Sequence, residues 1–485
     1  MRIYNTLPLL ALFFATDVFA DNNAQNIEIS IYNSNLALVK DVRSISLSQG
    51  INDIAFEGVA TEIKPESVMI VGKDINVLEQ NYDYDLITEH NIIKKSVGKE
   101  VKTIVQNPTT GENIFNKAKI LSASGNKPIL EFDYGIETDF NGRLVFDELP
   151  KNLREKPTLM AKLYSPDLKE QDLMLAYLTN GISWKTDYVA YIKNETTLDL
   201  TAWVTINNNS GVDYNGAKIQ LVAGDVNQVT ESFTRGPMLM AAKVYDYNSM
   251  SDSMAANNVT PEQLSSYQLY TLPNRTDIKN SQTKQMSLFE KFDVKYTQEG
   301  RLTSPLYFNG TYKADFEKRH PQMYYIMNNT SEGGLDISLP GGKMRFYEND
   351  AQNSLQFIGE NNINNTAKGE TIELMVGNMF NVFVNGKVVD VTEVSKTKKQ
   401  LTSNSCYNAD VVKDYVANVE FNNGDDKKVT VSFVQNINSN EVIKESIKGN
   451  NKNINQHEWK IEIPGNDKVK LDYVVRVKSN ERICD

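Results

Sequence analysis

Hydrophobic and polar residues alternate along much of this 485-residue chain, and long stretches with the 3.6-residue period of a helix are scarce. The alternating segments are rich in β-branched and aromatic residues, and clusters of Asn, Gly and Asp such as 207–211 (NNNSG) bound them. Both features are typical of short antiparallel strands joined by tight turns. The clearest strands are expected at 27–32, 200–206, 370–376, 416–421, 428–434 and 457–463. The pattern predicts a mainly β protein with little helix, in which several antiparallel β-sandwich or barrel modules are joined in one chain.

Changes in composition predict the domain boundaries. The segment 81–165 has short strands broken by Gly- and Asn-rich turns, and its size and spacing suit a small β-barrel-like unit. The segment 227–267 is rich in Ser, Asn, Met and Ala without periodicity, so we expect a mobile loop, which at this length is usually functional or disordered. The expected order is a signal peptide (1–20), an N-terminal β domain (21–80), the small unit (81–165), a β-sandwich region (166–400) and a C-terminal β-sandwich domain (401–485).

The N-terminus has the layout of a secretory signal peptide. Arg2 precedes the apolar run 7–15 (LPLLALFFA), and small residues stand at the −3 and −1 positions of a cleavage site after Ala20. The run is shorter than the roughly 20 residues that span a bilayer, and no later run is long enough. We therefore expect a soluble, exported mature chain without a transmembrane segment, in the periplasm or outside the cell.

The only two cysteines of the chain are Cys406 and Cys484. In an oxidising compartment two such thiols most simply form one disulfide, which the loop-entropy relation values at roughly 3–5 kcal/mol. Two buried free thiols are the alternative.

The charge balance restricts the partners. The formal net charge is −11, and no basic cluster with interleaved aromatic residues occurs. An acidic surplus argues against nucleic acid or anionic lipid as a partner.

No motif in the sequence assembles a catalytic or metal-binding set. His90, His320 and His457 lie far apart without an HExxH or CxxC pattern, and His457 stands beside Trp459 in an alternating strand, which favours a packed histidine. The segment 181–185 (GISWK) lacks the last glycine of a GxSxG elbow. We expect no catalytic residues, no metal and no cofactor, although a site assembled only in the fold stays open.

The segment 227–267 carries the remaining candidates for partner contact. Thioethers in an exported loop can hold Cu(I), but an adaptable apolar contact segment is favoured. Tyrosines there can stack on sugars or on a protein partner. The candidate residues are Met238, Met240, Met250, Met254, Tyr245 and Tyr247.

A Pro-Gly-Gly-Lys occurs in the segment 336–350 (DISLPGGKMRFYEND). A phosphate loop requires GxxxxGK followed by Ser or Thr, but Ile337 stands at the first glycine position and Met344 follows the lysine. We expect instead a β-hairpin, in which Pro340 and two glycines with positive φ turn 336–339 back onto the strand that follows. Arg345 would be a solvated residue of that strand.

Several segments together resemble the uncharacterised bacterial exported family related to mucoidy inhibitor A, over about residues 170 to 485. They are 182–192 (ISWKTDYVAYI), 198–227, 339–350 and 355–377, and 31–70 is similar to the β domain that precedes them in the family. Many members of the family have a long coiled coil where this chain has the segment 81–165. Any role of that coiled coil therefore does not transfer to this chain. The resemblance implies export and a mainly β fold, but the family has no agreed catalytic residues.

Together these observations favour a non-enzymatic structural or protein-interaction module of the cell envelope, with envelope proteins or surface polysaccharide as partners. Two alternatives stay open. A polysaccharide- or peptidoglycan-binding module predicts exposed tyrosines or tryptophans along one sheet face. A hydrolase predicts a deep cleft with a carboxylate or histidine of perturbed pKa.

Overall fold

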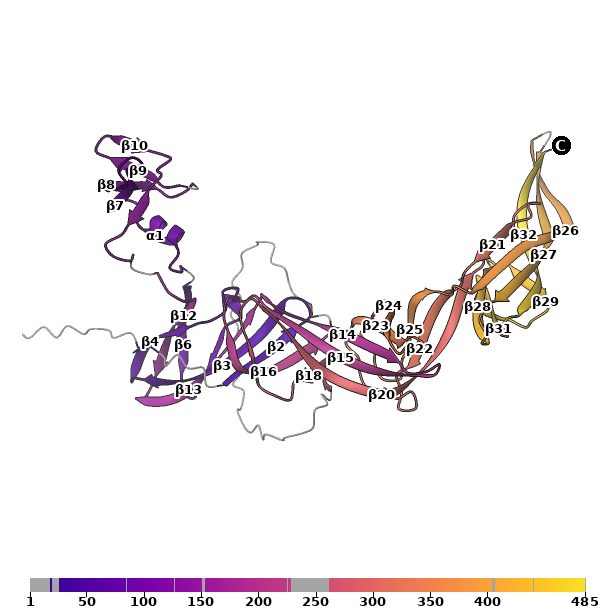
Figure 1. Ribbon diagram of the computed structural model, residues 1–485, viewed down its shortest axis with the longest axis horizontal. Helices are drawn as coiled ribbons and strands as arrows, with labels where there is room; N and C mark the ends of the chain where they lie inside the picture. Colours follow the sequence, from indigo (N-terminus) through magenta and orange to yellow (C-terminus); the bar gives the residue numbers. More distant parts are fainter. Residues whose placement is uncertain are drawn as a thin grey trace, which may run out of the picture. The chain divides into compact units, whose positions relative to one another are not determined.

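The computed structural model describes residues 18–19, 26–83, 85–125, 127–150, 153–224, 226–227, 261–403, 406–438 and 440–484. Within these ranges the chain forms five sheets and one α-helix (Figure 1). The prediction of a mainly β protein with little helix is therefore confirmed. Within the same ranges, no helix combines the length and the apolar character that crossing a bilayer requires.

Although β25 and β28 begin one residue later than predicted, the six segments singled out by their alternation all correspond to strands. The buried side of β31 shows why, because His457, Trp459, Ile461 and Ile463 all point into a core while the residues between them are more exposed. The strands are β2 (Asn26–Tyr32), β15 (Thr197–Asn208), β25 (Thr371–Asn378), β27 (Cys406–Asn423), β28 (Val429–Asn436) and β31 (Gln456–Ile463).

The chain divides into two compact units. Of the described residues, those up to 184, 206–227 and 269–284 belong to the first unit, and 185–205, 261–268 and 285–484 to the second. In sequence the division falls within β14 (Ile182–Ile192), β15, β18 (Tyr267–Thr271) and β20 (Gln282–Thr303), and β17 (Glu262–Leu264) precedes β18. The domain boundaries expected from composition stay predictions.

Two sheets of the first unit are built largely from the N-terminal strands and from strands beyond residue 157. One has the order β1-β4-β12-β6, and the other contains β16-β2-β3-β13-β5 with β19 beside β16. The new elements are β1 (Val18–Phe19), β3 (Leu36–Leu47), β4 (Gly50–Glu57), the 3-10 turn η1 (Pro65–Ser67), β5 (Met69–Val71), β6 (Asn76–Asp83), β12 (Thr158–Ser165), β13 (Lys169–Thr179), β16 (Tyr214–Ala223) and β19 (Thr276–Ile278).

A buried ion pair lies in the interior of the first unit. The inward positions of β3 include Val39 and Ile45, and between them stand Asp41 and Arg43, whose side chains are only 8% and 4% exposed. The Nε and Nη2 atoms of Arg43 donate to one carboxylate oxygen of Asp41 at 2.9 and 2.6 Å. Within the described residues, Arg43 Nη1 and Asp41 Oδ1 are buried without a hydrogen-bond partner.

The part of the chain from β6 to β12 folds around a small core of its own. A five-stranded sheet with the order β10-β9-β8-β7-β11 surrounds Ile120 and Leu130, and Thr88 caps the helix by accepting a hydrogen bond from the Asn91 amide. The elements are α1 (Glu89–Lys95), β7 (Glu100–Gln106), β8 (Asn113–Ser122), β9 (Ile129–Phe132), β10 (Gly135–Glu137) and β11 (Arg143–Val145).

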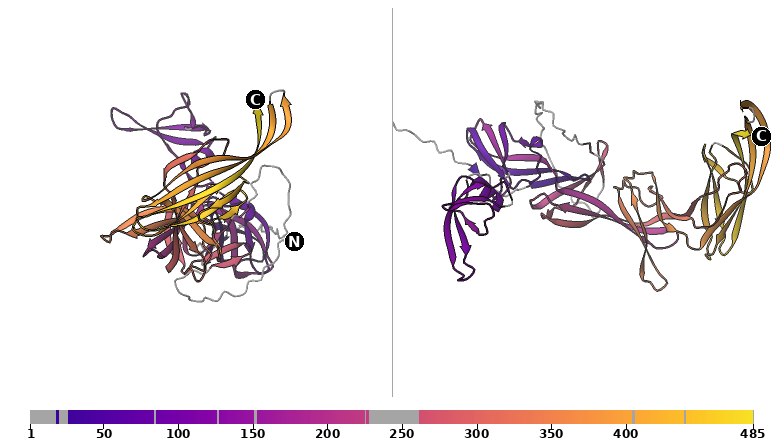
Figure 2. Two further views of the ribbon diagram at one scale, coloured as in Figure 1. Left: turned by 90° about the vertical axis from the view of Figure 1, so that its right-hand side faces the viewer. Right: turned by 90° about the horizontal axis from the view of Figure 1, so that it is seen from above.

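The second unit contains one sheet with the order β24-β23-β14-β15-β20-β28-β31-β30 and another with the order β21-β26-β27-β32-β29. Trp459, Phe433 and Tyr473 are fully buried in their shared core. Figures 1 and 2 show β26, β27 and β32 side by side as a long ribbon. The new strands are β21 (Asp315–Arg319), β22 (Gln322–Asn328), β23 (Gly342–Asn349), β24 (Leu355–Ile363), β26 (Val382–Ser403), β29 (Glu441–Glu445), β30 (Asn450–Asn453) and β32 (Lys468–Cys484).

The expected hairpin at the Pro-Gly-Gly-Lys is wrong. β23 begins at Gly342 but pairs antiparallel with β24 and parallel with β14, so neither of its edges is left for 336–339. Gly341 and Gly342 do not have positive φ. Glycine is needed at 342 for a different reason, because a Cβ there would lie 2.2 Å from the carbonyl oxygen of Thr186.

Buried tyrosines predict how the protein responds to alkali. Burial raises the pKa of Tyr177, Tyr214, Tyr270, Tyr325 and Tyr473, in the case of Tyr214 to about 12. A group whose pKa is higher in the folded state contributes stability below its unfolded pKa of about 10, and this stability is lost as the pH rises above that value.

We therefore expect cooperative unfolding above about pH 10, with a late step in tyrosinate absorbance at 295 nm that coincides with loss of the near-UV circular dichroism. A single tyrosinate transition near pH 10 with the fold intact would contradict this expectation.

Candidate functional site

The loop between β20 and β21, residues 304–314 (SPLYFNGTYKA), places two aromatic rings in solvent. We call it the tyrosine loop. Its apolar and aromatic residues point in two directions. Leu306 and Ala314 are buried in the core of the second unit, whereas Tyr307 and Tyr312 are 54% and 56% exposed. Exposed rings held next to a buried backbone are a usual feature of contact surfaces.

The first half of the tyrosine loop is fixed by buried hydrogen bonds. The Ser304 amide donates to the carbonyl of Val434 at 2.7 Å. The Gln435 side chain, which is fully buried, donates to the carbonyl of Leu306 at 2.9 Å and accepts a hydrogen bond from the Tyr473 hydroxyl at 2.7 Å. Because buried hydrogen bonds of this kind are costly to break, this half is held in one conformation.

Hydrogen bonds also hold the second half, where the one from Tyr415 is partly buried and the one from Lys313 is exposed. The Tyr415 hydroxyl donates to the carbonyl of Gly310 at 2.9 Å, Lys313 Nζ donates to the carbonyl of Val389 at 2.7 Å, and the Val388 amide donates to the carbonyl of Ala314 at 2.8 Å. Gly310 has a φ of +58°, which its missing Cβ permits. The loop is therefore preorganised, and a ligand that meets it need not order it first.

The two exposed rings form one unit. The ring centroids of Tyr307 and Tyr312 are 5.4 Å apart and their planes differ by 7°, within the range of offset stacking. Partial desolvation, followed by interaction with Tyr312, raises the pKa of Tyr307, so that its hydroxyl is neutral at ordinary pH. Asn309, Thr311 and Lys313 are also exposed in this loop. The tyrosine loop thus offers flat apolar surfaces beside groups that donate and accept hydrogen bonds.

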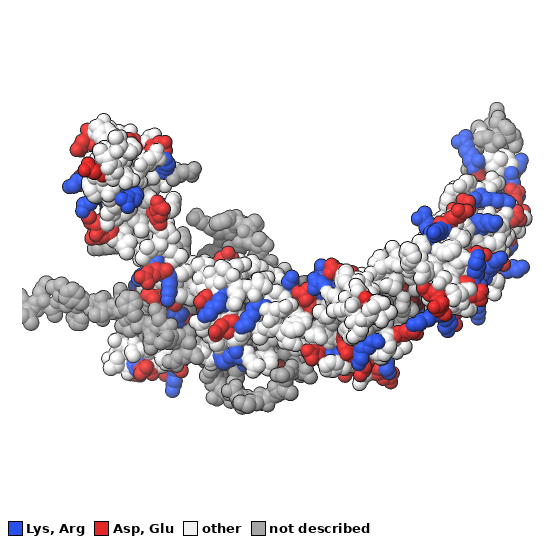
Figure 3. Space-filling view, viewed as in Figure 1, with Lys and Arg blue, Asp and Glu red and all other residues white. Residues whose placement is uncertain are grey.

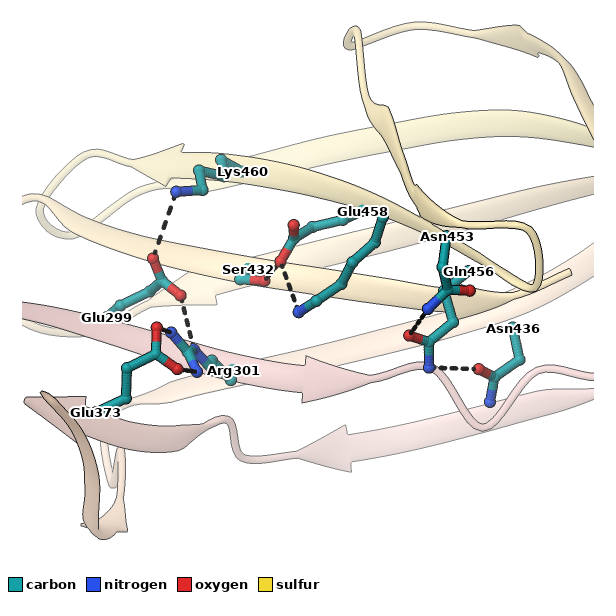
Figure 4. Close-up of polar contacts among 10 residues, drawn as sticks. Glu299, Arg301, Glu373, Ser432, Asn436, Asn453, Gln456, Glu458 and Lys460 are labelled. Atoms are coloured by element: carbon teal, nitrogen blue, oxygen red, sulfur yellow. Dashed lines mark hydrogen bonds and ion pairs between the residues drawn. The ribbon is translucent and has the colours of Figure 1, made fainter. Parts of the chain in front are cut away.

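Besides the tyrosine loop, the second unit has a belt of ion pairs across one sheet face (Figure 4). Arg301 on β20 makes two hydrogen bonds to Glu373 on β25, at 2.6 and 2.9 Å, and its Nε donates to Glu299 at 2.9 Å. Lys460 on β31 lies 3.8 Å from Glu299, and the guanidinium lies 4.5 Å from the centre of the Tyr324 ring. Each charge is matched, so we interpret the belt as joining the strands rather than as a ligand site.

The face continues beyond the belt with more matched polar groups. Ser432 donates to Glu458, which also lies 3.5 Å from Lys452. Figure 4 shows that the amides of Asn453, Gln456 and Asn436 follow in a chain of hydrogen bonds. Figure 3 likewise shows basic and acidic side chains interspersed over the visible face of the described residues.

The belt predicts a small, acid-sensitive contribution to stability. Hydrogen bonding from Arg301 lowers the pKa of Glu373, so the stability it contributes is present above the unfolded pKa of about 4.5 and is lost as the pH falls below it. We expect Arg301→Met to lower the free energy of unfolding by about 1 kcal/mol at pH 7, since these groups are partly exposed.

Urea denaturation of Arg301→Met and wild type at pH 7 and pH 3.5 measures the contribution of this ion pair to the free energy of unfolding. Lys460→Met is a control that removes only one longer contact. The difference between Arg301→Met and wild type should shrink at pH 3.5. A difference that grows in acid is incompatible with the assignment.

The structure places the three histidines apart from one another. His90 lies on α1, and Nδ1 of His320 contacts the carbonyls of Met379 and Val382. His457 is buried as its strand pattern predicts, and its ring nitrogens lie 2.7 Å from Asn451 Oδ1 and 3.0 Å from Glu445 Oε2. Among the described residues, no three His, Cys, Asp or Glu side chains lie close enough together to hold a metal ion.

The other sequence candidates divide between the two cysteines and the predicted loop. In the ladder between β27 and β32, Cys406 stands directly opposite Cys484. The methionine and tyrosine candidates of the segment 227–267 lie outside the described residues. They are Met238, Met240, Met250, Met254, Tyr245 and Tyr247.

A shallow, open hollow of about 230 Å³ on the face of β4, β12 and β6 gathers carboxylates. Each has a cation nearby, with Lys162 3.4 Å from Glu79 and Arg154 3.6 Å from Asp83. A hydrogen bond from Asn81, followed by the interactions with Lys162, lowers the pKa of Glu79. A general acid needs the opposite shift, so Glu79 does not have the electrostatics of the acid of a glycosidase.

Sequence reasoning did not single out the tyrosine loop. A signal for it is present, because Tyr307 and Tyr312 flank the Asn309-Gly310 turn within a segment that does not alternate. A scan against protein-family models and a search of curated proteins both find no match to this chain.

Proposed function

We propose that this chain is an exported, non-enzymatic protein of the cell envelope that attaches to another envelope component through the tyrosine loop. The observation that carries the proposal is the pair of exposed, stacked rings of Tyr307 and Tyr312 on a loop that buried and partly buried hydrogen bonds hold in place. Tyrosine is enriched among the residues that dominate binding energies, and a rigid loop loses little conformational entropy on binding.

Export is supported by the signal-peptide layout of residues 1–20 and by the resemblance to the exported family related to mucoidy inhibitor A. We extend the proposal to a disulfide between Cys406 and Cys484. Residues directly opposite in an antiparallel pair have Cα atoms about 4.5–5.5 Å apart, which lies within the range that a disulfide bridges.

Site-directed photo-crosslinking tests the proposed attachment. A benzophenone amino acid placed at position 307 of the full exported chain should form covalent adducts with envelope material, whereas the same group at Tyr134, which is even more exposed, should not. Adducts that form equally at both positions, or at neither, would remove the tyrosine loop from the account.

A further inference from the structure

We propose that the component bound by the tyrosine loop is a glycan, and specifically the flat face of a pyranose ring inside a polymer of equatorially linked sugars. This inference rests on the proposed function, because it names the partner of the same site. Three features of the tyrosine loop support it: the exposed surface of its two rings, the polar residues of the same loop and the open, solvent-exposed position of the site.

The rings provide the apolar part of the site. A pyranose whose substituents are equatorial presents a face of axial C–H bonds, which are weakly positive, and the face of a tyrosine ring is negative. The rings of Tyr307 and Tyr312 are stacked in nearly parallel planes and both are more than half exposed, so ring surface is available without any movement of the loop. The ring surface that the stacking partner leaves uncovered matches the flat face of a sugar.

The neighbouring groups distinguish a sugar from a protein. The core of a protein interface is depleted in charged residues and enriched in apolar ones. Here the exposed residues of the loop besides the two tyrosines are Pro305, Asn309, Thr311 and Lys313, of which three are polar. An amide and a hydroxyl each both donate and accept hydrogen bonds, as sugar hydroxyls do.

The charge near the rings favours a neutral sugar. Lys313 Nζ is held by the carbonyl of Val389 at 2.7 Å and lies 3.9 Å from Asp390, so its charge is partly compensated. An uncompensated lysine would instead favour an acidic sugar. The tyrosine loop therefore fits neutral or N-acetylated hexoses.

The openness of the site favours internal units of a polymer over chain ends. Enclosed sites bury most of a small ligand's surface. The tyrosine loop instead offers exposed rings that contact one side of the ligand. A single sugar is then held weakly, and affinity comes from neighbouring units of one chain along the two rings.

Titration of the full mature chain with defined hexasaccharides tests this inference. Cellohexaose and chitohexaose have equatorial linkages, maltohexaose has axial ones, and saturation-transfer NMR and calorimetry report binding. We expect the first two to bind, with Kd on the order of 1 mM, and maltohexaose to bind at least about tenfold more weakly. Each single substitution, Tyr307→Ser or Tyr312→Ser, should weaken binding about tenfold, and the double variant should not bind measurably.

Matched controls separate binding from folding. Tyr307→Phe keeps the ring and should bind within about twofold of wild type, and Phe380→Ser removes an aromatic residue that is 87% exposed elsewhere and should have no effect. Unchanged thermal unfolding of the double variant shows that the fold is intact, since neither ring is buried.

The outcomes also separate this inference from the proposed function. No binding of either equatorial hexasaccharide, or binding that the double variant retains, would overturn the glycan assignment. If position 307 still crosslinks to an envelope protein, the proposed function stands and its partner is a protein. Loss of both results would overturn both.

Discussion

Replacing Arg43 by methionine is expected to lower the free energy of unfolding of the first unit by about 3–5 kcal/mol, because it leaves the carboxylate of Asp41 buried without a cation. Arg43 supplies both hydrogen bonds that the buried carboxylate receives, and one of its oxygens already has none. Removing the partner of a buried charge costs more than the pair itself contributes. Pulse proteolysis in urea, with peptides from β3 and β13 identified by mass spectrometry, reports this unit separately.

A double variant isolates the cause. Asp41→Leu combined with Arg43→Met removes both charges and should recover most of the lost stability, because apolar replacement of a whole buried ion pair is often neutral or stabilising. Lys162→Met, which removes a partly exposed cation of the same unit, should change stability by less than about 0.5 kcal/mol. A double variant less stable than Arg43→Met would contradict the account.

Loss of the proposed disulfide is the second large effect. Cys406 and Cys484 enclose the strands from β27 to β32, so the loop-entropy relation predicts that Cys484→Ser lowers the free energy of unfolding by about 3–5 kcal/mol. The cysteines lie at the end of the ribbon, where a small cluster of Tyr407, Ala409, Val411 and Ile483 packs on the strands. Local opening should therefore begin there once the crosslink is absent.

Hydrogen exchange followed by mass spectrometry measures this effect in the oxidised protein, the reduced protein and Cys484→Ser. Peptides covering the start of β27 and the end of β32 should exchange faster in the last two, while peptides of β31 change less. Equal exchange in all three, together with two titratable thiols in the untreated protein, would show that the cysteines are not paired.

The sequence predicts strands well where one face of a sheet is buried. β31 is an example, because burial on one face imposes the alternation that its residues show. The sequence does not predict in the same way which strands pair with each other, because the backbone hydrogen bonds between strands do not depend on the identity of the side chains. Gly342 illustrates the limit, since its role is close approach to Thr186 on β14 and not a turn between neighbours.

Polar residues inside the fold also escape prediction. Asp41 and Arg43 occupy inward positions of β3 that pattern analysis assigns to apolar residues, and only the three-dimensional structure pairs them. The same holds for Arg301 and Glu373, which lie far apart in sequence on β20 and β25. In the tyrosine loop the two tyrosines are visible in the sequence, but their exposure depends on buried anchors such as Gln435.

Co-sedimentation of the full mature chain with its own purified envelope fraction tests the central claim most directly. The wild-type chain and the Phe380→Ser control should sediment with the envelope, while Tyr307→Ser combined with Tyr312→Ser should stay in the supernatant, with all three equally stable. Wild-type-like sedimentation of the double tyrosine variant would contradict the claim that the tyrosine loop attaches this protein to the envelope.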